Sequence, residues 1–159
     1  YFQDSKSRID NSSKDKPNAN DDYGKSKYLG EIPEASMVLR TSIIGPAKDN
    51  AGLFEWFRNC NNSEIKGYIN HIWSGVTTLQ LAETIHSIID NNQYKFGIYH
   101  LASPKISKYD LLKEINETFD LNKNIVSYYD INYINRSLIA DIQCQDIKQQ
   151  LVKLKEFIL

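Results

Sequence analysis

The feature that most constrains this fold is an alternation of strand-like and helix-like segments along the chain. Short runs of β-branched and apolar residues are typical of buried strands, and segments with helical spacing of apolar residues lie between them. Strands that alternate with helices predict the α/β class, and Ser36–Ile44, stopped by Gly45-Pro46, is expected to be a buried parallel strand. The other expected strands are Ile65–Trp73, Tyr94–Leu101 and Asn124–Tyr129.

The expected helices can be given starting residues and buried faces. Asp21 or Asp22 begins the first helix, which ends by Gly30 to Pro33, and a short aromatic helix covers Leu53–Cys60. Thr77 and Ser107 each begin a further helix through a capping pattern, and the last helix covers Gln145–Ile158. The residues expected to face inward are Leu79, Ala82, Ile85 and Ile89 in the third helix, Leu111, Ile115 and Phe119 in the fourth, and Ile147, Leu151, Leu154 and Ile158 in the last.

Tyr23 and Lys27, in the first expected helix, are candidates for chemistry. They are four residues apart, so their side chains lie on one helix face, one turn from each other. A neighbouring ammonium group favours the ionised form of a phenol, so Tyr23 is a candidate to exchange a proton with a carbonyl or an alcohol. Taken alone, such a pair is also common on solvated helix faces.

The wider context is a resemblance to a known family. The segment from Tyr23 to Glu31 resembles the catalytic helix of the extended short-chain dehydrogenase/reductases, and Val38–Gly45 resembles the strand that follows it. His71–Thr78 and Gly97–Leu101 are similar to the C-terminal half of dTDP-4-dehydrorhamnose reductase and related nucleotide-sugar enzymes. The resemblance runs from about residue 17 to about residue 141. It implies the C-terminal part of a Rossmann-type doubly wound sheet plus a small substrate-binding subdomain.

The resemblance implies hydride transfer between NADPH or NADH and a carbon of a nucleotide-sugar, as in the reduction of a 4-keto sugar. Tyr23 would protonate the ketone oxygen, and Lys27 would hold the nicotinamide ribose and tune Tyr23. Both residues would therefore also contact the cofactor. The family's third catalytic residue, a Ser or Thr that polarises the carbonyl, is not identifiable in this chain.

The glycines of the chain do not form the cofactor motif of the family. That motif is a glycine-rich turn that holds the cofactor pyrophosphate at a helix N-terminus, and none of the seven glycines falls in such an arrangement. The chain also begins at Tyr1 rather than at a methionine. We interpret residues 21–159 as the C-terminal, substrate-binding part of a longer enzyme and residues 1–20 as a loop or flexible lead-in. We expect an N-terminal half to bind most of the cofactor, and the partner of this chain to be that half or a second copy.

The end of the strand at Ser36–Ile44 offers further candidates. In open α/β sheets ligands bind beyond the carboxyl ends of the strands, so Thr41, Ser42 and Ile43 are expected to line the nicotinamide or sugar pocket. Arg40 is a candidate substrate contact, or alternatively the partner of a buried carboxylate.

Trp73 and Arg136 are candidate substrate residues through the resemblance. The turn from Trp73 to Thr77 resembles part of the substrate-facing subdomain, and Arg136 resembles a late arginine that lies near the nucleotide-sugar in the family. A guanidinium matches the oxygens of a diphosphate two at a time. The alternative for Arg136 is a solvated loop arginine.

Composition excludes several classes of function. The chain has 159 residues, with 19 basic and 20 acidic side chains and a formal charge of −1, so electrostatics recruits neither nucleic acid nor a membrane surface. The apolar runs are too short to cross a bilayer. Cys60 and Cys144 are isolated and the three histidines are scattered, which predicts a cytoplasmic protein without a metal site.

Three functions stay open from the sequence. The first is a nucleotide-sugar 4-keto reductase, with an epimerase or a dehydratase as neighbouring reactions. The second is a non-catalytic regulatory subunit of the same fold. The third is a fragment that folds without a complete site.

Overall fold

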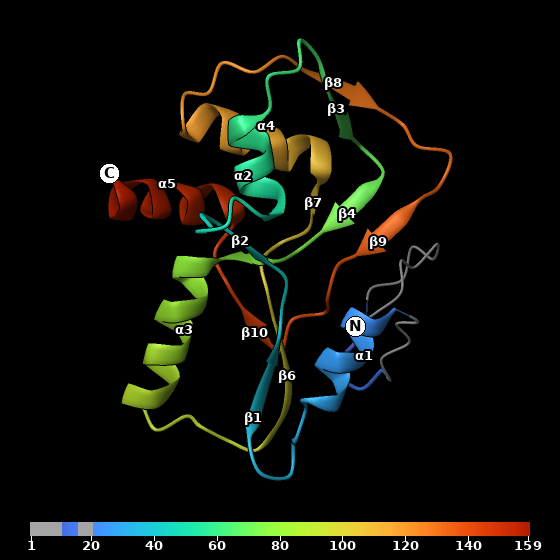
Figure 1. Cartoon of the computed structure of the whole chain (residues 1–159). Helices are drawn as coiled ribbons and strands as arrows, with labels where there is room; N and C mark the ends of the chain where they lie inside the picture. The colour runs from blue at the N-terminus through green and yellow to red at the C-terminus, as the bar shows by residue number, and fades with distance from the viewer. Residues whose placement is uncertain (1–10, 16–20) are drawn as a thin grey trace.

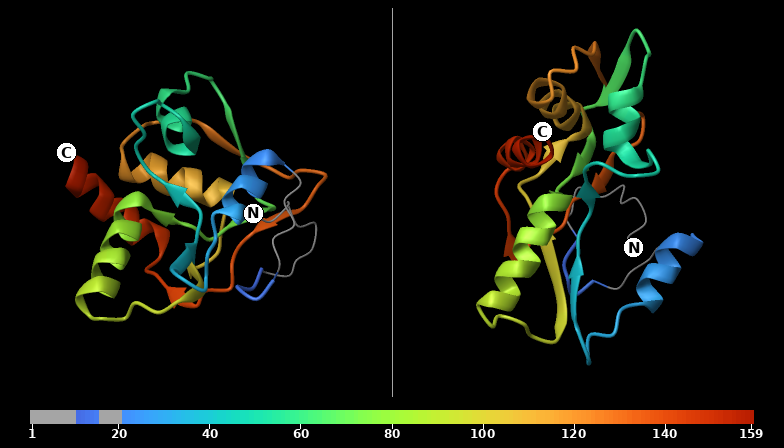
Figure 2. Two further views of the ribbon diagram at one scale, coloured as in Figure 1. Left: turned by 60° about the horizontal axis from the view of Figure 1, so that its bottom comes forward. Right: turned by 60° about the vertical axis from the view of Figure 1, so that its left-hand side comes forward.

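The structure is a computed structural model that describes residues 11–15 and 21–159 (Figure 1). Its main sheet is parallel, with the strand order β1 (Met37–Arg40), β6 (Gly97–Ala102) and β10 (Ile142–Gln143). The helices α1 (Asp22–Leu29) and α3 (Thr78–Asp90) lie on opposite sides of this sheet (Figure 2). The predicted α/β class is therefore confirmed.

A second group of short strands lies above the main sheet in Figure 1. Strand β4 (His71–Trp73) pairs with β9 (Ile134–Arg136) in parallel and with β7 (Ile106–Ser107) antiparallel. Two further parallel pairs are β3 (Ile65–Tyr68) with β8 (Ile125–Tyr128) and β2 (Ile43–Ile44) with β5 (Val76–Thr77).

Three helices pack around these strands and form the hydrophobic core with them. They are α2 (Gly52–Asn59), α4 (Lys108–Thr118) and α5 (Ile147–Ile158). Their apolar side chains that are at most 1% exposed are Phe54, Phe57, Leu111, Ile115 and Leu151. None of the helices within residues 11–15 and 21–159 is long and apolar enough to cross a membrane.

Four helices of the described part begin at a capping side chain, and for α1, α3 and α4 it is the residue that the sequence predicts. Asp21 accepts a hydrogen bond from the backbone N–H of Gly24 at 2.7 Å, which satisfies one of the free donors of the first turn. Thr77, Ser107 and Asp146 do the same for α3, α4 and α5. Short polar side chains therefore set the start of these four helices.

Two of the expected strands are each divided into two, so the prediction of single strands was wrong. Ser36–Ile44 is interrupted at Thr41-Ser42, because β1 pairs with β6 whereas β2 pairs with β5. Ile65–Trp73 is interrupted at Ile69-Asn70, where the side-chain amide of Asn70 donates to the carbonyl oxygens of Asp130 and Asn132 at 2.8 and 3.1 Å. In both places a tertiary contact redirects the chain within an apolar run.

The predicted inward stripe of α3 was also wrong. Ile85 and Ile89 are 41% and 62% exposed, whereas Ile88 is buried at 7%. Apolar residues occur on more than one face of this helix, so their spacing does not single out the face that packs on β5 and α5. The inward residues of α4 and α5 are confirmed, except that Ile158, at the end of α5, is 39% exposed.

Helix α1 and strand β1 form an open side of the molecule. Tyr23 and Leu29 on α1 are 73% and 81% exposed. Among the described strands, none pairs with the outer edge of β1. Of the predicted lead-in, residues 11–15 form a turn in which Asn11 bridges to Leu138, and residues 1–10 and 16–20 lie outside the described part of the chain.

Candidate functional site

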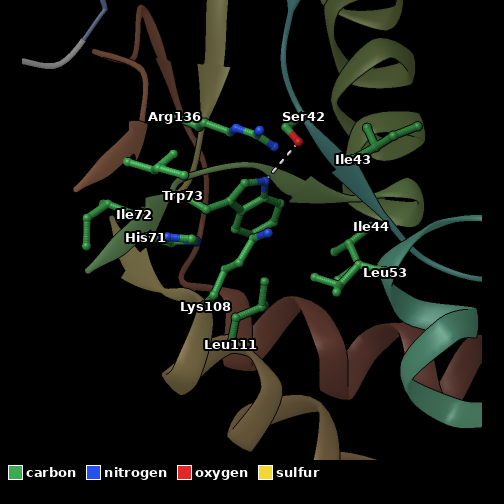
Figure 3. Close-up of a pocket in the computed structure, with 11 residues that line it drawn as sticks. Ser42, Ile43, Ile44, Leu53, His71, Ile72, Trp73, Lys108, Leu111 and Arg136 are labelled. Atoms are coloured by element: carbon green, nitrogen blue, oxygen red, sulfur yellow. Dashed lines mark hydrogen bonds between the residues drawn. The ribbon is translucent and has the colours of Figure 1, made fainter. Parts of the chain in front are cut away.

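A cavity of about 250 Å³ lies between β2, β4, β9 and the start of α4 (Figure 3). Most of its wall is apolar, and its polar side chains are Ser42, His71, Lys108 and Arg136. The residues that line it are Ser42, Ile43, Ile44, Leu53, His71, Ile72, Trp73, Lys108, Leu111, Ile134 and Arg136. Two cations and no carboxylate are among these lining residues, so the cavity suits a ligand with an anionic group and an apolar body.

The two cations come from elements that the fold brings together. Strands β4 and β9 pair in a register that places Arg136 beside Trp73. Lys108 is the first residue of α4, directly after the capping residue Ser107. A lysine is unfavourable at the positive end of a helix dipole, so Lys108 does not stabilise the start of α4.

Trp73 and Ser42 are joined by a hydrogen bond inside the cavity. The indole Nε1–H of Trp73 donates to Oγ of Ser42 at 2.8 Å (Figure 3). Trp73 is 8% exposed, so its ring is largely enclosed by the protein. The bond links the turn at Thr41-Ser42 to strand β4.

His71 is held between an aromatic ring and a carboxylate. Its ring stacks on Tyr68, with centroids 4.3 Å apart and an interplanar angle of 8°, and its Nε2 lies 3.3 Å from Oδ2 of Asp130. Burial, and then the nearby charges of Lys108 and Arg136, lower the pKa of His71, and Asp130 opposes this shift only in part. His71 is therefore neutral at physiological pH, and the positive charge of the cavity comes from Lys108 and Arg136.

Tyr23 and Lys27 lie side by side on α1, as their spacing predicts. The Lys27 ammonium group is 5.4 Å from the centre of the Tyr23 ring. Tyr23 is 73% exposed, and neither residue is among those that line the cavity. The pair faces outward on the open side of the molecule.

Arg40 makes the ion pair that was the alternative to a substrate contact. Its Nε and Nη2 donate to the two carboxylate oxygens of Glu31 at 2.7 and 2.8 Å. The side chains of Arg40 and Glu31 are 4% and 3% exposed. Arg40 therefore ties the end of α1 to β1, and it does not line the cavity.

The structure brings together four of the residues singled out in the sequence, and it adds others. Ser42, Ile43, Trp73 and Arg136 line one cavity, whereas Thr41 does not. Sequence reasoning did not single out His71 and Lys108, which also line the cavity. The lysine at the start of a helix was a usable signal, but nothing in the sequence showed that Asp130 and Tyr68 would hold His71.

The lowered pKa values of two buried histidines predict how the stability of the fold depends on pH. His71 and His100 have pKa values lowered from 6.5, in both cases mainly by burial, and Arg40 adds to the effect at His100 while Asp141 opposes it. Below pH 6.5 the unfolded chain takes up protons at these sites that the folded chain does not. The free energy of unfolding is therefore expected to be full above pH 6.5 and to fall as the pH is lowered from 6.5 toward the folded pKa values, as measured by urea unfolding at several pH values.

A variant of His100 tests the source of this pH dependence. His100→Gln removes a side chain that is fully buried and should make the dependence shallower. An equal slope in wild type and His100→Gln would show that His100 is not a source of the effect.

In comparisons with known proteins, no protein-family model matches the chain and no curated protein matches it in sequence. Solved structures do match its fold. A dTDP-4-dehydrorhamnose reductase from Clostridium acetobutylicum is similar with a TM-score of 0.75 and 18% identity, over 99% of this chain and 63% of that one. A dTDP-4-dehydrorhamnose reductase from Bacillus anthracis in complex with NADP has a TM-score of 0.76 and 17% identity, over 99% and 62%.

A dTDP-glucose 4,6-dehydratase from Bacillus anthracis in complex with NAD is also similar, with a TM-score of 0.66 and 11% identity, over 95% of this chain and 56% of that one. At these identities the likeness shows the fold. The chain thus has the fold of one part of these enzymes, spanning less than two thirds of their length, and the resemblance inferred from the sequence motifs is confirmed at that level.

Proposed function

We propose that the chain is the C-terminal, substrate-binding part of an NAD(P)-dependent nucleotide-sugar reductase that reduces a 4-keto sugar. The observation that carries the proposal is the cavity in which Lys108 and Arg136 meet an apolar wall. A nucleotide-sugar has this pairing of properties, since its diphosphate is anionic and its base has apolar faces. The similarity in fold to dTDP-4-dehydrorhamnose reductases supports the same assignment.

We assign proton transfer to Tyr23 and part of the cofactor binding to Lys27. Their exposed position on one face of α1 fits a nicotinamide ribose, whose hydroxyl groups Lys27 would bind. The cofactor supplies the hydride when bound. Tyr23 would protonate the ketone oxygen of the sugar through its phenol O–H. Ser42 and Ile43 would border the ligand where β1 gives way to β2.

Partners and location form part of the same proposal. The open edge of β1 and the exposed face of α1 offer a place for the N-terminal, cofactor-binding half of the enzyme or for a second copy. Cys60 and Cys144 are free thiols, which suits the reducing cytoplasm.

Ligand binding to the cavity tests the proposal without any need for turnover. The chain has two tryptophans, Trp56 and Trp73, and only Trp73 lines the cavity. In a Trp56→Phe background, dTDP is expected to change the fluorescence of Trp73 with a saturable titration curve. Arg136→Ala or Lys108→Ala should weaken binding about tenfold or more, because each removes a charge-assisted hydrogen bond.

The matched control is Lys113→Ala, which removes the same charge from an exposed position on the same helix. It should leave the affinity for dTDP unchanged. An equal loss of dTDP affinity in Lys113→Ala and Lys108→Ala would mean that the overall charge of the chain, and not a contact in the cavity, causes the effect. A wild-type chain that does not respond to dTDP would contradict the nucleotide-sugar assignment.

Turnover separates the reductase from the alternatives. The longest polypeptide that contains this chain is mixed with NADPH and dTDP-4-dehydrorhamnose, and loss of the reduced nicotinamide is followed by absorbance. Net oxidation of NADPH is the expected result. A changed sugar without net oxidation would indicate an epimerase or dehydratase, and binding without any reaction would indicate a regulatory subunit.

A further inference from the structure

The hydrogen bond from Trp73 to Ser42 leaves the hydroxyl proton of Ser42 free to donate to another group. An indole N–H can only donate, so at 2.8 Å from Trp73 Nε1 the hydroxyl oxygen of Ser42 must be the acceptor. The hydroxyl proton of Ser42 then points elsewhere. Within residues 11–15 and 21–159, Oγ of Ser42 accepts from Trp73, and the structure shows no hydrogen bond that this hydroxyl donates. Ser42 is exposed and lines the cavity, so this donor is available to a ligand.

The position of Ser42 is fixed by its backbone as well. The carbonyl oxygen of Ser42 accepts a hydrogen bond from the backbone N–H of Val76 at 2.9 Å. A side chain at Gly75 would collide with this carbonyl oxygen and with the ring of Trp73, so the glycine permits the close approach of the two segments. Trp73 and Ser42 therefore form one rigid unit rather than a chance contact.

The residues around Trp73 and Ser42 indicate which kind of ligand atom the Ser42 hydroxyl would bind. Figure 3 shows the side chain of Arg136 directed toward Ser42, with Lys108 on the other side of the Trp73 ring. A hydroxyl donor beside a guanidinium suits an oxygen that can accept several hydrogen bonds and carries negative charge. A phosphoryl oxygen has both properties.

We propose that Trp73 is a positioning residue that sets Ser42 as a hydrogen-bond donor to a phosphoryl oxygen of the bound ligand. The inference rests on the proposed function, in that the ligand is a nucleoside diphosphate. It goes beyond that function by giving Trp73 a role through Ser42 rather than by direct contact with the sugar.

A double-mutant cycle on dTDP affinity tests this role. Calorimetric titration of the chain is expected to show about tenfold weaker binding for Ser42→Ala, because a donor to a charged oxygen is lost. Trp73→Phe removes the N–H and should weaken binding about threefold, since the hydroxyl then turns freely. In the Ser42→Ala background Trp73→Phe should have almost no further effect, because its action passes through Ser42. Independent, multiplying losses would overturn the positioning role.

Nuclear magnetic resonance provides a readout that does not depend on the ligand. The two indole N–H signals belong to Trp56 and Trp73. Ser42→Ala should shift the Trp73 signal. The Trp56 signal should not shift, because Trp56 lies on α2 outside the cavity. An unchanged Trp73 signal would show that the hydrogen bond does not form. Because this measurement uses only Ser42→Ala, it tests the hydrogen bond even if Trp73→Phe does not fold.

The same titrations separate the two hypotheses. If wild type binds dTDP and Ser42→Ala binds it equally well, the positioning role fails while the proposed function stands. If wild type does not bind dTDP, the proposed function fails and the phosphoryl assignment fails with it. A loss confined to dTDP-glucose, with dTDP unaffected, would place the acceptor on the sugar and overturn the assignment to phosphate.

Discussion

Replacing Glu31 by alanine is expected to lower the free energy of unfolding by about 3–5 kcal/mol, because it removes one partner of a buried ion pair with Arg40. The two side chains are 3% and 4% exposed and share two hydrogen bonds of 2.7 and 2.8 Å. With a urea m-value of about 2 kcal/mol/M, the midpoint of urea unfolding should fall by about 2 M.

Two further variants show whether the effect comes from the pair. Glu34→Ala removes an exposed carboxylate three residues away and should change stability by less than about 0.5 kcal/mol. Replacing both Glu31 and Arg40 by leucine should recover most of the loss, since both charges of the pair are then removed from the interior. A double variant as unstable as Glu31→Ala would mean that the packing around this site matters more than the charges.

Replacing Tyr23 by phenylalanine should slow reduction of the 4-keto sugar about 10²–10⁴-fold in the complete enzyme, because only the proton donor is lost. Cofactor affinity should be almost unchanged, since the ring and Lys27 remain. The measurement is steady-state turnover together with titration of NADPH. Turnover close to wild type would show that the hydroxyl of Tyr23 takes no part in the reaction.

Neighbouring residues on α1 supply the controls for this experiment. Tyr28→Phe removes the same hydroxyl from a tyrosine that is 49% exposed on the same helix, and it should leave turnover unchanged. Lys27→Ala should both slow the reaction and weaken cofactor binding, whereas Lys25→Ala should do neither. A loss shared by Lys25 and Lys27 would indicate a general effect on the helix.

The sequence predicted most of the elements of this fold but not how they pair. Helix starts at Asp21, Thr77 and Ser107 are local properties, because a short polar side chain caps the N–H groups that follow it within three residues. The division of Ser36–Ile44 depends on Val76 and Trp73, which are more than thirty positions away in the chain. Such long-range contacts leave no signal in an apolar run.

The candidate site was predictable to a similar degree. Ser42 and Ile43 were predicted as pocket residues because ligands gather at the carboxyl ends of parallel strands, and both line the cavity. Arg136 and Trp73 were predicted through the resemblance, and both also line it. His71 was missed as a site residue because its surroundings, Tyr68 and Asp130, come from different strands and loops. For Arg40, sequence left two roles open, and the nine-residue separation from Glu31 gave no reason to choose the ion pair.

The cavity lies where the chain passes several times between the main sheet and the upper strands, and these passages are bonded to one another. The backbone N–H of Ser103 donates to the carbonyl oxygen of Ser74 at 2.9 Å. The hydroxyl group of Ser103 donates to the carbonyl oxygen of Gly75 at 2.6 Å. The backbone N–H of Leu138 donates to Oγ of Ser74 at 2.9 Å. Within residues 21–159, these hydrogen bonds tie the passages to one another and so limit hinge motion between the two parts. A ligand therefore meets a preformed cavity and loses little binding energy to ordering it, so variants of the wall should differ in how long the ligand stays rather than in how fast it arrives.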